Sequence, residues 1–135
     1  MFKTIDLSKL LDKFKFSAIQ EWINNTVNWQ QPLTLTDAAT VNWNYRDGYN
    51  AKVTLAGNRT LNINGLKPGA YGTLEIIQGS GGSRTLTLPT QYTNKVANDG
   101  GGLLTLSSVE QQIDVAAFYY NGSYILWTLS TNFTS

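Results

Sequence analysis

The chain has 135 residues, of which 14% are charged, a net charge of +1, and neither cysteine nor histidine. This length suits one domain with a buried core, and the charge leaves no basic face for a nucleic-acid backbone. Without Cys or His we expect no disulfide, no usual zinc site, no Ser-His-Asp triad and no cysteine nucleophile. No apolar run is long enough to cross a membrane, and the mixed opening "MFKTIDLSKLLDKFKF" is unlike a signal peptide. We therefore expect a protein without metal or cofactor that is not an enzyme.

Residues 1–31 carry a helical pattern, with apolar side chains at spacings of three and four and a capping box, "SAIQ", at 17–20. The pattern predicts two short helices, or one helix broken near Phe16, and neither would be stable alone in water. We expect this segment to anchor the chain to another protein or to join copies of the chain. The alternative is that this segment only covers the open end of the β domain's hydrophobic core. Its apolar stripe consists of Leu7, Leu10, Leu11, Phe14, Ile19, Trp22 and Ile23.

Residues 32–135 follow a different period, in which apolar and polar side chains alternate in short runs. Turn-forming stretches such as "RDGYN", "KPGAYG" and "ANDGGG" separate these runs roughly every eight to twelve positions. Such a pattern is typical of an all-β domain. The sequence predicts a β-sandwich or jelly roll of about eight strands behind a short N-terminal helical segment.

The glycine-rich stretch "GSGGS" at 79–83 raises the question of phosphate binding. A phosphate loop leads from a strand into a helix, whose amides face the anion. Here "RTLTLP" follows, which alternates like a strand, and no lysine stands at the P-loop position. We therefore predict a hairpin in which Gln78 lies opposite Arg84, not a nucleotide site.

The stretch "FYYNGSYILW" has the Asn-Gly signal of a two-residue type I′ hairpin, which would place Tyr120 opposite Ser123. Both faces of this hairpin are apolar, whereas a solvated outer sheet alternates with polar residues. We expect either the N-terminal helices or another subunit to cover one of these faces.

Two further stretches concern how the strands connect. The pattern of "VTLAGNRTLNI" does not fit a tight hairpin, because a two-residue turn at Gly57-Asn58 would set apolar side chains beside polar ones. A loop of odd length would restore the match. We favour the other solution, in which the two strands lie in different sheets. "RTLNI" at 59–63 and "RTLTL" at 84–88 resemble each other. We interpret them as two strands of one sheet rather than as a duplication.

The stretch "NYRDGYN" at 44–50 is the candidate binding motif, since aromatic rings beside polar groups suit sugar rings. It predicts a glycan contact through Tyr45, Arg46 and Tyr49, and the alternative is an Asp-Gly turn with its aromatics in the core. Paired carboxylates that would cleave a glycosidic bond are disfavoured, because most of them flank turns or begin strands. The carboxylates of the β region are Asp37, Asp47, Glu75, Asp99, Glu110 and Asp114.

The stretch "NAKVTLAGNRTLNINGLKPGAYGTLEIIQGSGGSRTLTLP" resembles a β module that recurs in virion proteins of tailed bacteriophages, and "IDVAAFYYNGSYILWT" resembles its closing hairpin. The resemblance covers about residues 40–130. Such modules occur in head fibres, capsid decoration proteins and tail-fibre tips, usually as trimers, and are not known as enzymes.

The resemblance implies a structural protein on the virion surface, made in the bacterial cytoplasm, and a small head fibre or decoration protein suits a short N-terminal segment best. The implied partners are two further copies of the chain and a capsid or other virion protein bound through residues 1–31, with a host glycan as a further candidate. Neither nucleic-acid binding nor membrane insertion is expected. The alternative function is a carbohydrate-binding adhesion module, which would need exposed aromatic side chains outside the core.

Overall fold

The computed structural model describes residues 18, 31–99 and 102–134. The chain divides into two units, Met1–Gln31 and Pro32–Ser135, and the second is described below. The apolar stripe predicted for residues 1–31 lies outside the described residues, so its anchoring role stays a prediction.

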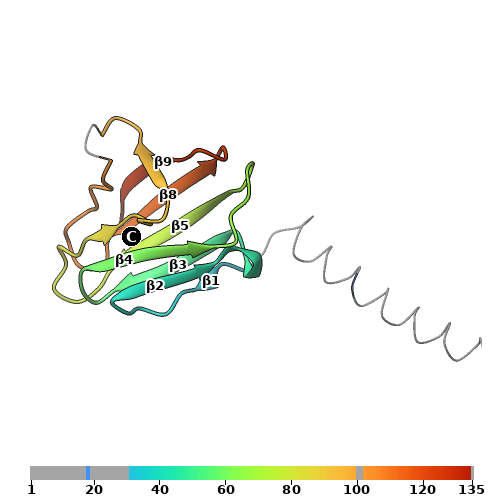
Figure 1. Ribbon diagram of the computed structural model, residues 1–135. Helices are drawn as coiled ribbons and strands as arrows, with labels where there is room; N and C mark the ends of the chain where they lie inside the picture. Colours follow the sequence, from blue (N-terminus) through green and yellow to red (C-terminus); the bar gives the residue numbers. More distant parts are fainter. Residues whose placement is uncertain (1–17, 19–30, 100–101, 135) are drawn as a thin grey trace, which may run out of the picture. The chain divides into compact units, whose positions relative to one another are not determined.

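The second unit is a two-layer all-β sandwich, as predicted (Figure 1). One sheet has six strands in the order β1-β3-β5-β8-β9-β7, and the other has three in the order β2-β4-β6. A short 3-10 helix, η2 (Tyr45–Asp47), connects β2 to β3. In chain order the strands are β1 (Leu33–Thr34), β2 (Thr40–Asn44), β3 (Asn50–Leu55), β4 (Arg59–Asn64), β5 (Tyr71–Gln78), β6 (Leu86–Thr87), β7 (Thr93–Val96), β8 (Ile113–Tyr120) and β9 (Tyr124–Phe133).

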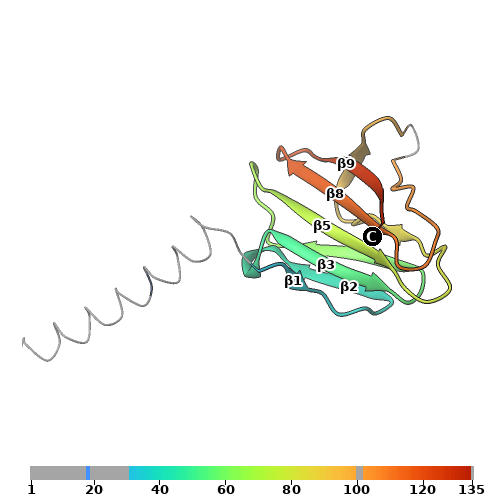
Figure 2. The same cartoon turned by 180° about the vertical axis from the view of Figure 1, so that it is seen from behind.

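The first six strands alternate between the two sheets, and each pairs in parallel with the strand two places along the chain. This half therefore winds in coils and has no antiparallel hairpins of the kind that a jelly roll contains. The second half is different: β8 runs antiparallel to β5, β9 antiparallel to β8, and β7 parallel to β9. Seen from behind, β3, β5 and β8 lie side by side (Figure 2).

The strand directions give the sandwich two distinct ends. At the β1 end, β1, β3 and β5 begin, and η2 forms the connection. At the loop end, β3 and β5 finish, β4 and β6 begin, and β8 starts opposite the finish of β9. Figure 1 shows η2 at one end and the connections out of β3 and β5 at the other.

Alternate apolar side chains from both sheets form the core. Leu61 and Ile63 of β4 and Leu74 and Ile76 of β5 are at most 1% exposed. Burying each such side chain stabilises the fold by about 1.5–3 kcal/mol. At the centre, the Phe118 ring lies 5.6 Å from that of Trp43 and 5.2 Å from that of Trp127, measured between ring centroids.

The hairpin predicted around the glycine-rich stretch is wrong. β5 and β6 belong to different sheets, so the 79–85 connection crosses the sandwich. Gln78 does meet Arg84, but through its side chain: the amide accepts from the Arg84 N–H and donates to the Arg84 carbonyl, both at 2.9 Å. The stretch leads into a strand, as expected. Gly82 is required because its φ is +58° and a Cβ would lie 2.2 Å from the Ser108 carbonyl oxygen.

The C-terminal hairpin has the predicted faces but a turn one residue later. Asn121 lies opposite Tyr124, and Gly122, at φ +97°, takes the first turn position. The Asn121 side-chain oxygen accepts from the N–H groups of Ser123 (2.9 Å) and Tyr124 (2.8 Å). The side chain of Asn121 therefore closes an Asx-turn, and Gly122 adopts the positive φ that the turn requires. Phe118 consequently faces Trp127 and not Ile125.

Both remaining expectations about connections are confirmed. β3 and β4, which carry "VTLAGNRTLNI", lie in different sheets. The similar segments "RTLNI" and "RTLTL" contribute β4 and β6, which are parallel neighbours with Arg59 opposite Leu86 and Thr60 opposite Thr87.

Candidate functional site

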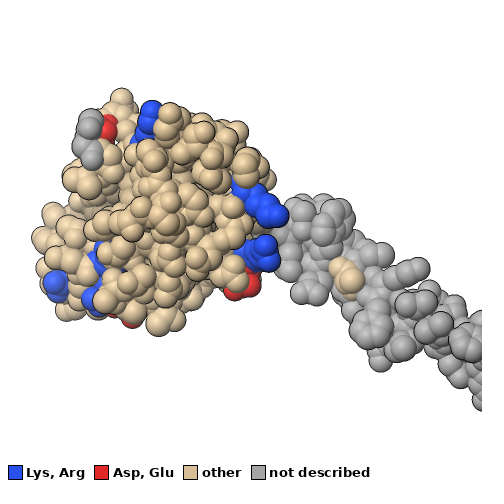
Figure 3. Space-filling view, in the orientation of Figure 1, with Lys and Arg blue, Asp and Glu red and all other residues tan. Residues whose placement is uncertain are grey.

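The two outer faces of the sandwich differ in chemistry. On the three-stranded sheet, β2 and β4 both present the outward pattern Thr-x-Asn-x-Asn in register. The Asn62 amide donates to Asn42 at 3.0 Å, and Gln91 donates to Asn62 at 2.6 Å. Charged side chains stand mainly towards the edges of the side drawn in Figure 3. This face is therefore a flat, polar and nearly uncharged surface.

The outer face of the six-stranded sheet is apolar along β8. The inward residues Ala116 and Phe118 are buried, and the outward residues Val115 and Ala117 are half-buried. Tyr119, at the β1 end of the strand, is 48% exposed. A sheet with one solvated face normally alternates apolar with polar residues, so β8 has the composition of a strand covered on both faces.

Exposed aromatic and aliphatic side chains line up at the β1 end of this face. Tyr71, Tyr119 and Leu126 occupy neighbouring positions on β5, β8 and β9, and they are 64%, 48% and 39% exposed. The Lys95 ammonium lies 3.9 Å from the centroid of the Tyr124 ring. Beside them, Ala117, Ala97 and Thr128 line a hollow of about 460 Å³. We call Tyr71, Tyr119, Leu126, Tyr124 and Lys95 the aromatic row.

Two of the three predicted glycan residues, Tyr45 and Tyr49, lie next to Tyr71 of this row. Tyr45 is half-buried, its ring contacts Phe118, and its hydroxyl donates to the Tyr71 carbonyl at 2.8 Å. Burial raises the pKa of the Tyr45 hydroxyl above its ordinary value of 10.0. Arg46 is exposed, and the half-buried Tyr49 ring lies 6.1 Å from the ring of Tyr71. Tyr45 thus has the core position of the alternative interpretation, and Tyr71, which the motif did not include, offers the most exposed ring.

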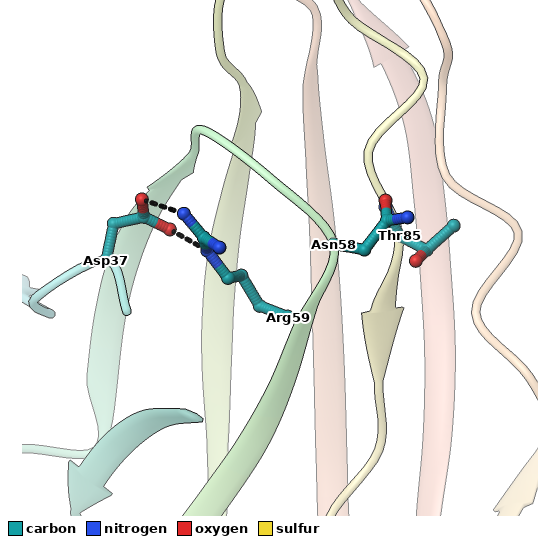
Figure 4. Close-up of polar contacts among 4 residues, drawn as sticks. All are labelled: Asp37, Asn58, Arg59 and Thr85. Carbon is teal, nitrogen blue, oxygen red and sulfur yellow. Dashed lines mark hydrogen bonds and ion pairs between the residues drawn. The ribbon is translucent and has the colours of Figure 1, made fainter. Parts of the chain in front are cut away.

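Paired polar side chains brace the loop end. Asp37 and Arg59 form two hydrogen bonds of 2.8 Å, and the Asn58 side chain accepts from the Thr85 N–H at 3.0 Å (Figure 4). The Arg59 guanidinium holds the pKa of Asp37 below its ordinary value of 3.8 and is itself held protonated. These contacts tie the segment before β2 and the corner between β3 and β4 to the start of β6.

A polar hollow of about 340 Å³ opens at the loop end. Beneath it the Asp114 carboxylate, 1% exposed, accepts from the Ser107 N–H and hydroxyl, both at 2.6 Å, and from the Asn132 N–H at 3.0 Å. We call this polar hollow the loop-end hollow. Its lining consists of Thr105, Leu106, Ser107, Ser108, Val109, Gln112, Thr131 and Asn132.

The sequence motifs did not include the residues of the loop-end hollow. One signal pointed to it: Asp114 is a charged residue at an inward position of the apolar strand "IDVAAFYY". A buried carboxylate requires several donors, so this position marks a polar network.

The carboxylates in the described part of the chain are not gathered into a metal site. Within the described residues, no group of three or more Asp and Glu side chains could hold a metal ion. In the same part of the chain, no helix is long and apolar enough to cross a membrane.

Comparisons of the chain with protein-family models, with curated proteins and with solved structures find no match.

Proposed function

We propose that the protein is a non-enzymatic structural component of a tailed-phage virion, of the small head fibre or capsid decoration type. In this proposal residues 1–31 attach it to the capsid or to another virion protein, and it acts on the virion surface as a homotrimer. The observation that carries the proposal is the apolar outer face of β8, which calls for a covering partner.

A second copy of the chain is the partner that suits this face. The aromatic row is uncharged except for Lys95, which is engaged by the Tyr124 ring. Towards the loop end the same face continues through Thr73, Val115, Ile77 and Ile113, with one charged side chain, Glu75, opposite Val115. Obligate subunit interfaces have this apolar, aromatic composition. The polar face of the three-stranded sheet would remain in solvent.

The position of the aromatic row agrees with attachment through residues 1–31. The row lies at the β1 end, where the chain joins the sandwich at Leu33. An N-terminal segment that gathers copies of the chain would therefore bring their aromatic rows together. The loop end is the opposite end of the same strands, and in this proposal it would serve as the exposed fibre tip.

The experiment compares the molar mass of the full chain and of two variants by light scattering. Tyr119→Arg places a charge in the aromatic row, and Thr87→Arg is the matched control on the outer face of the other sheet, where Thr87 is exposed. We expect a trimer for the wild type and the control and smaller species for Tyr119→Arg. A monomeric wild type would contradict the proposal, as would an unchanged Tyr119→Arg trimer.

The virion assignment has its own test. Purified capsids should bind the full chain, and a glycan array run in parallel should give no tight binding. Tight binding to a defined glycan together with no binding to capsids would favour a free carbohydrate-binding module.

Carbohydrate binding is the second candidate function, and two observations favour it. The rings of Tyr71 and Tyr119 are exposed outside the core, as the adhesion alternative requires. The loop-end hollow adds a concave, hydroxyl-rich surface. Adhesion and a structural role are compatible in one virion protein.

A further inference from the structure

We propose that the loop-end hollow is a binding site for a neutral saccharide. The inference deepens the proposed function in its adhesive form, because it names the ligand class and the site of a fibre whose other end is held by the virion.

The groups lining the hollow suit a polyol. Thr105, Ser108 and Thr131 bring hydroxyls, and Gln112 and Asn132 bring side-chain amides. Hydroxyls and amides both donate and accept hydrogen bonds, so they pair with sugar hydroxyls in either direction. Leu106 and the 59% exposed Val109 supply an apolar border for the C–H side of a sugar ring.

The charge of the hollow selects against ionic ligands. Its lining residues include no Lys, Arg, Asp or Glu. The buried carboxylate of Asp114, which is bonded to the lining residues Ser107 and Asn132, is occupied by three donors and is 1% exposed, and the exposed Glu110 lies in the chain between the lining residues Val109 and Gln112. An acidic sugar would find no cation among the lining residues and would lie close to a buried negative charge, which is unfavourable. The ligand is therefore an uncharged hexose or N-acetylhexosamine unit.

The site is held in place before any ligand arrives. Asp114 fixes Ser107 and the backbone of Asn132, and Gln112 accepts from the Val109 N–H at 2.9 Å and donates to the Asn132 side chain at 2.5 Å. Gln111 and Asn132 have φ values of 66° and 69°. Residues other than glycine seldom adopt this left-handed backbone region. Such backbone conformations cost free energy and are found most often at functional sites. A site that is already formed before the ligand binds loses less conformational entropy on binding.

The volume of about 340 Å³ lies at the lower end of the range for small-molecule sites, which is large enough for one or two sugar rings. A single site of this size binds weakly. Three such sites on one trimer would hold a surface polysaccharide by multivalency.

The test is an NMR titration of the full chain with glucose, galactose, N-acetylglucosamine and their disaccharides, with glucuronic acid as the anionic comparison. We expect shifts in amides of residues 105–112 and 131–132 for at least one neutral sugar, and no saturable shifts with glucuronic acid. Thr131→Val removes one hydroxyl from the hollow and should weaken binding roughly threefold to tenfold. Thr87→Val, at an exposed position on the outer face of the other sheet and outside both hollows, is the matched control and should bind as the wild type does.

The outcomes separate this inference from the proposed function. If no neutral sugar shifts these amides, or if Thr87→Val weakens binding as much as Thr131→Val, the inference is overturned and a trimeric virion protein remains. If the sugar binds here but the protein is monomeric and does not bind capsids, the inference holds and the virion proposal fails.

Discussion

Asp37 and Arg59 bind each other through two parallel hydrogen bonds of 2.8 Å across the loop end. Asp37 precedes β2, and Arg59 is the first residue of β4. The pair therefore joins two successive coils of the chain at the corner where β3 in one sheet gives way to β4 in the other.

The pair makes a pH-dependent contribution to stability. Because Arg59 lowers the pKa of Asp37 in the folded state, the contribution is present above the ordinary value of 3.8 and is lost as the pH falls through the lowered value. Asp37→Asn should lower the melting temperature at pH 7 and make little difference near pH 2. Thermal melts followed by circular dichroism test this. The effect should be modest because both side chains are partly exposed. An equal difference at both pH values would contradict the ionic explanation.

Gln78 is the second stabilising contact to test. Its buried side chain satisfies both backbone groups of Arg84, as a neighbouring strand would. Gln78→Leu keeps a similar volume but leaves an N–H and a carbonyl without a partner. We expect a loss of about 2–3 kcal/mol in the free energy of unfolding, measured in urea. The exposed Gln31 provides the control, since Gln31→Leu should change stability by less than about 0.5 kcal/mol. Similar losses in both variants would contradict this role for Gln78.

The turn of the C-terminal hairpin depends on Gly122. Gly122→Ala should destabilise the domain by about 1–2 kcal/mol, because φ is +97° and a Cβ would lie 3.2 Å from Pro68. Ser123→Ala, one position further along the turn, should be nearly neutral because only the Ser123 N–H is used in the hydrogen bond to Asn121. Urea unfolding of the two variants makes the comparison. If alanine is tolerated at 122, the turn is adaptable and the register has another cause.

The N-terminal segment is tested by its removal. A chain that begins at Pro32 should keep the circular dichroism spectrum of a β protein, because the sandwich has its own core. Its association should be weaker than that of the full chain, as light scattering over a range of concentrations would reveal. If it associates as strongly as the full chain, residues 1–31 are not the element of assembly.

The alternation of side chains predicted which residues are buried but not which strands are neighbours. A hairpin with Gln78 opposite Arg84 would place Leu74, Ile76, Leu86 and Leu88 on one face, and all four are buried. β5, which carries Leu74 and Ile76, and β6, which carries Leu86, lie in different sheets, however, and all four side chains belong to one core. Alternation of apolar and polar side chains identifies the buried face of a strand. The same alternation occurs whether the chain makes a hairpin or crosses to the other sheet, so it does not distinguish the two. Where the pattern broke, at "VTLAGNRTLNI", the different sheets could be predicted.

The candidate site was less accessible to sequence reasoning for a related reason. The loop-end hollow joins residues 105–112 to the finish of β9, about twenty positions away, through backbone groups and a buried carboxylate. No local sequence motif predicts that these two segments lie together. The glycan contact predicted from "NYRDGYN" stays a prediction, and the motif could not reveal that Tyr45 contacts Phe118 or that Tyr71 joins Tyr49 from another strand.

The strand directions also decide how the domain would respond to mechanical force. The chain enters at the β1 end, whereas the loop-end hollow lies at the opposite end of the same strands. In a fibre fixed to a virion and attached to a cell, tension would run along β3, β5 and β8. Their ladder hydrogen bonds lie across that direction and would share the load together in shear, instead of opening one by one as in a peeled hairpin. Strands loaded in this way would make such a fibre resistant to pulling.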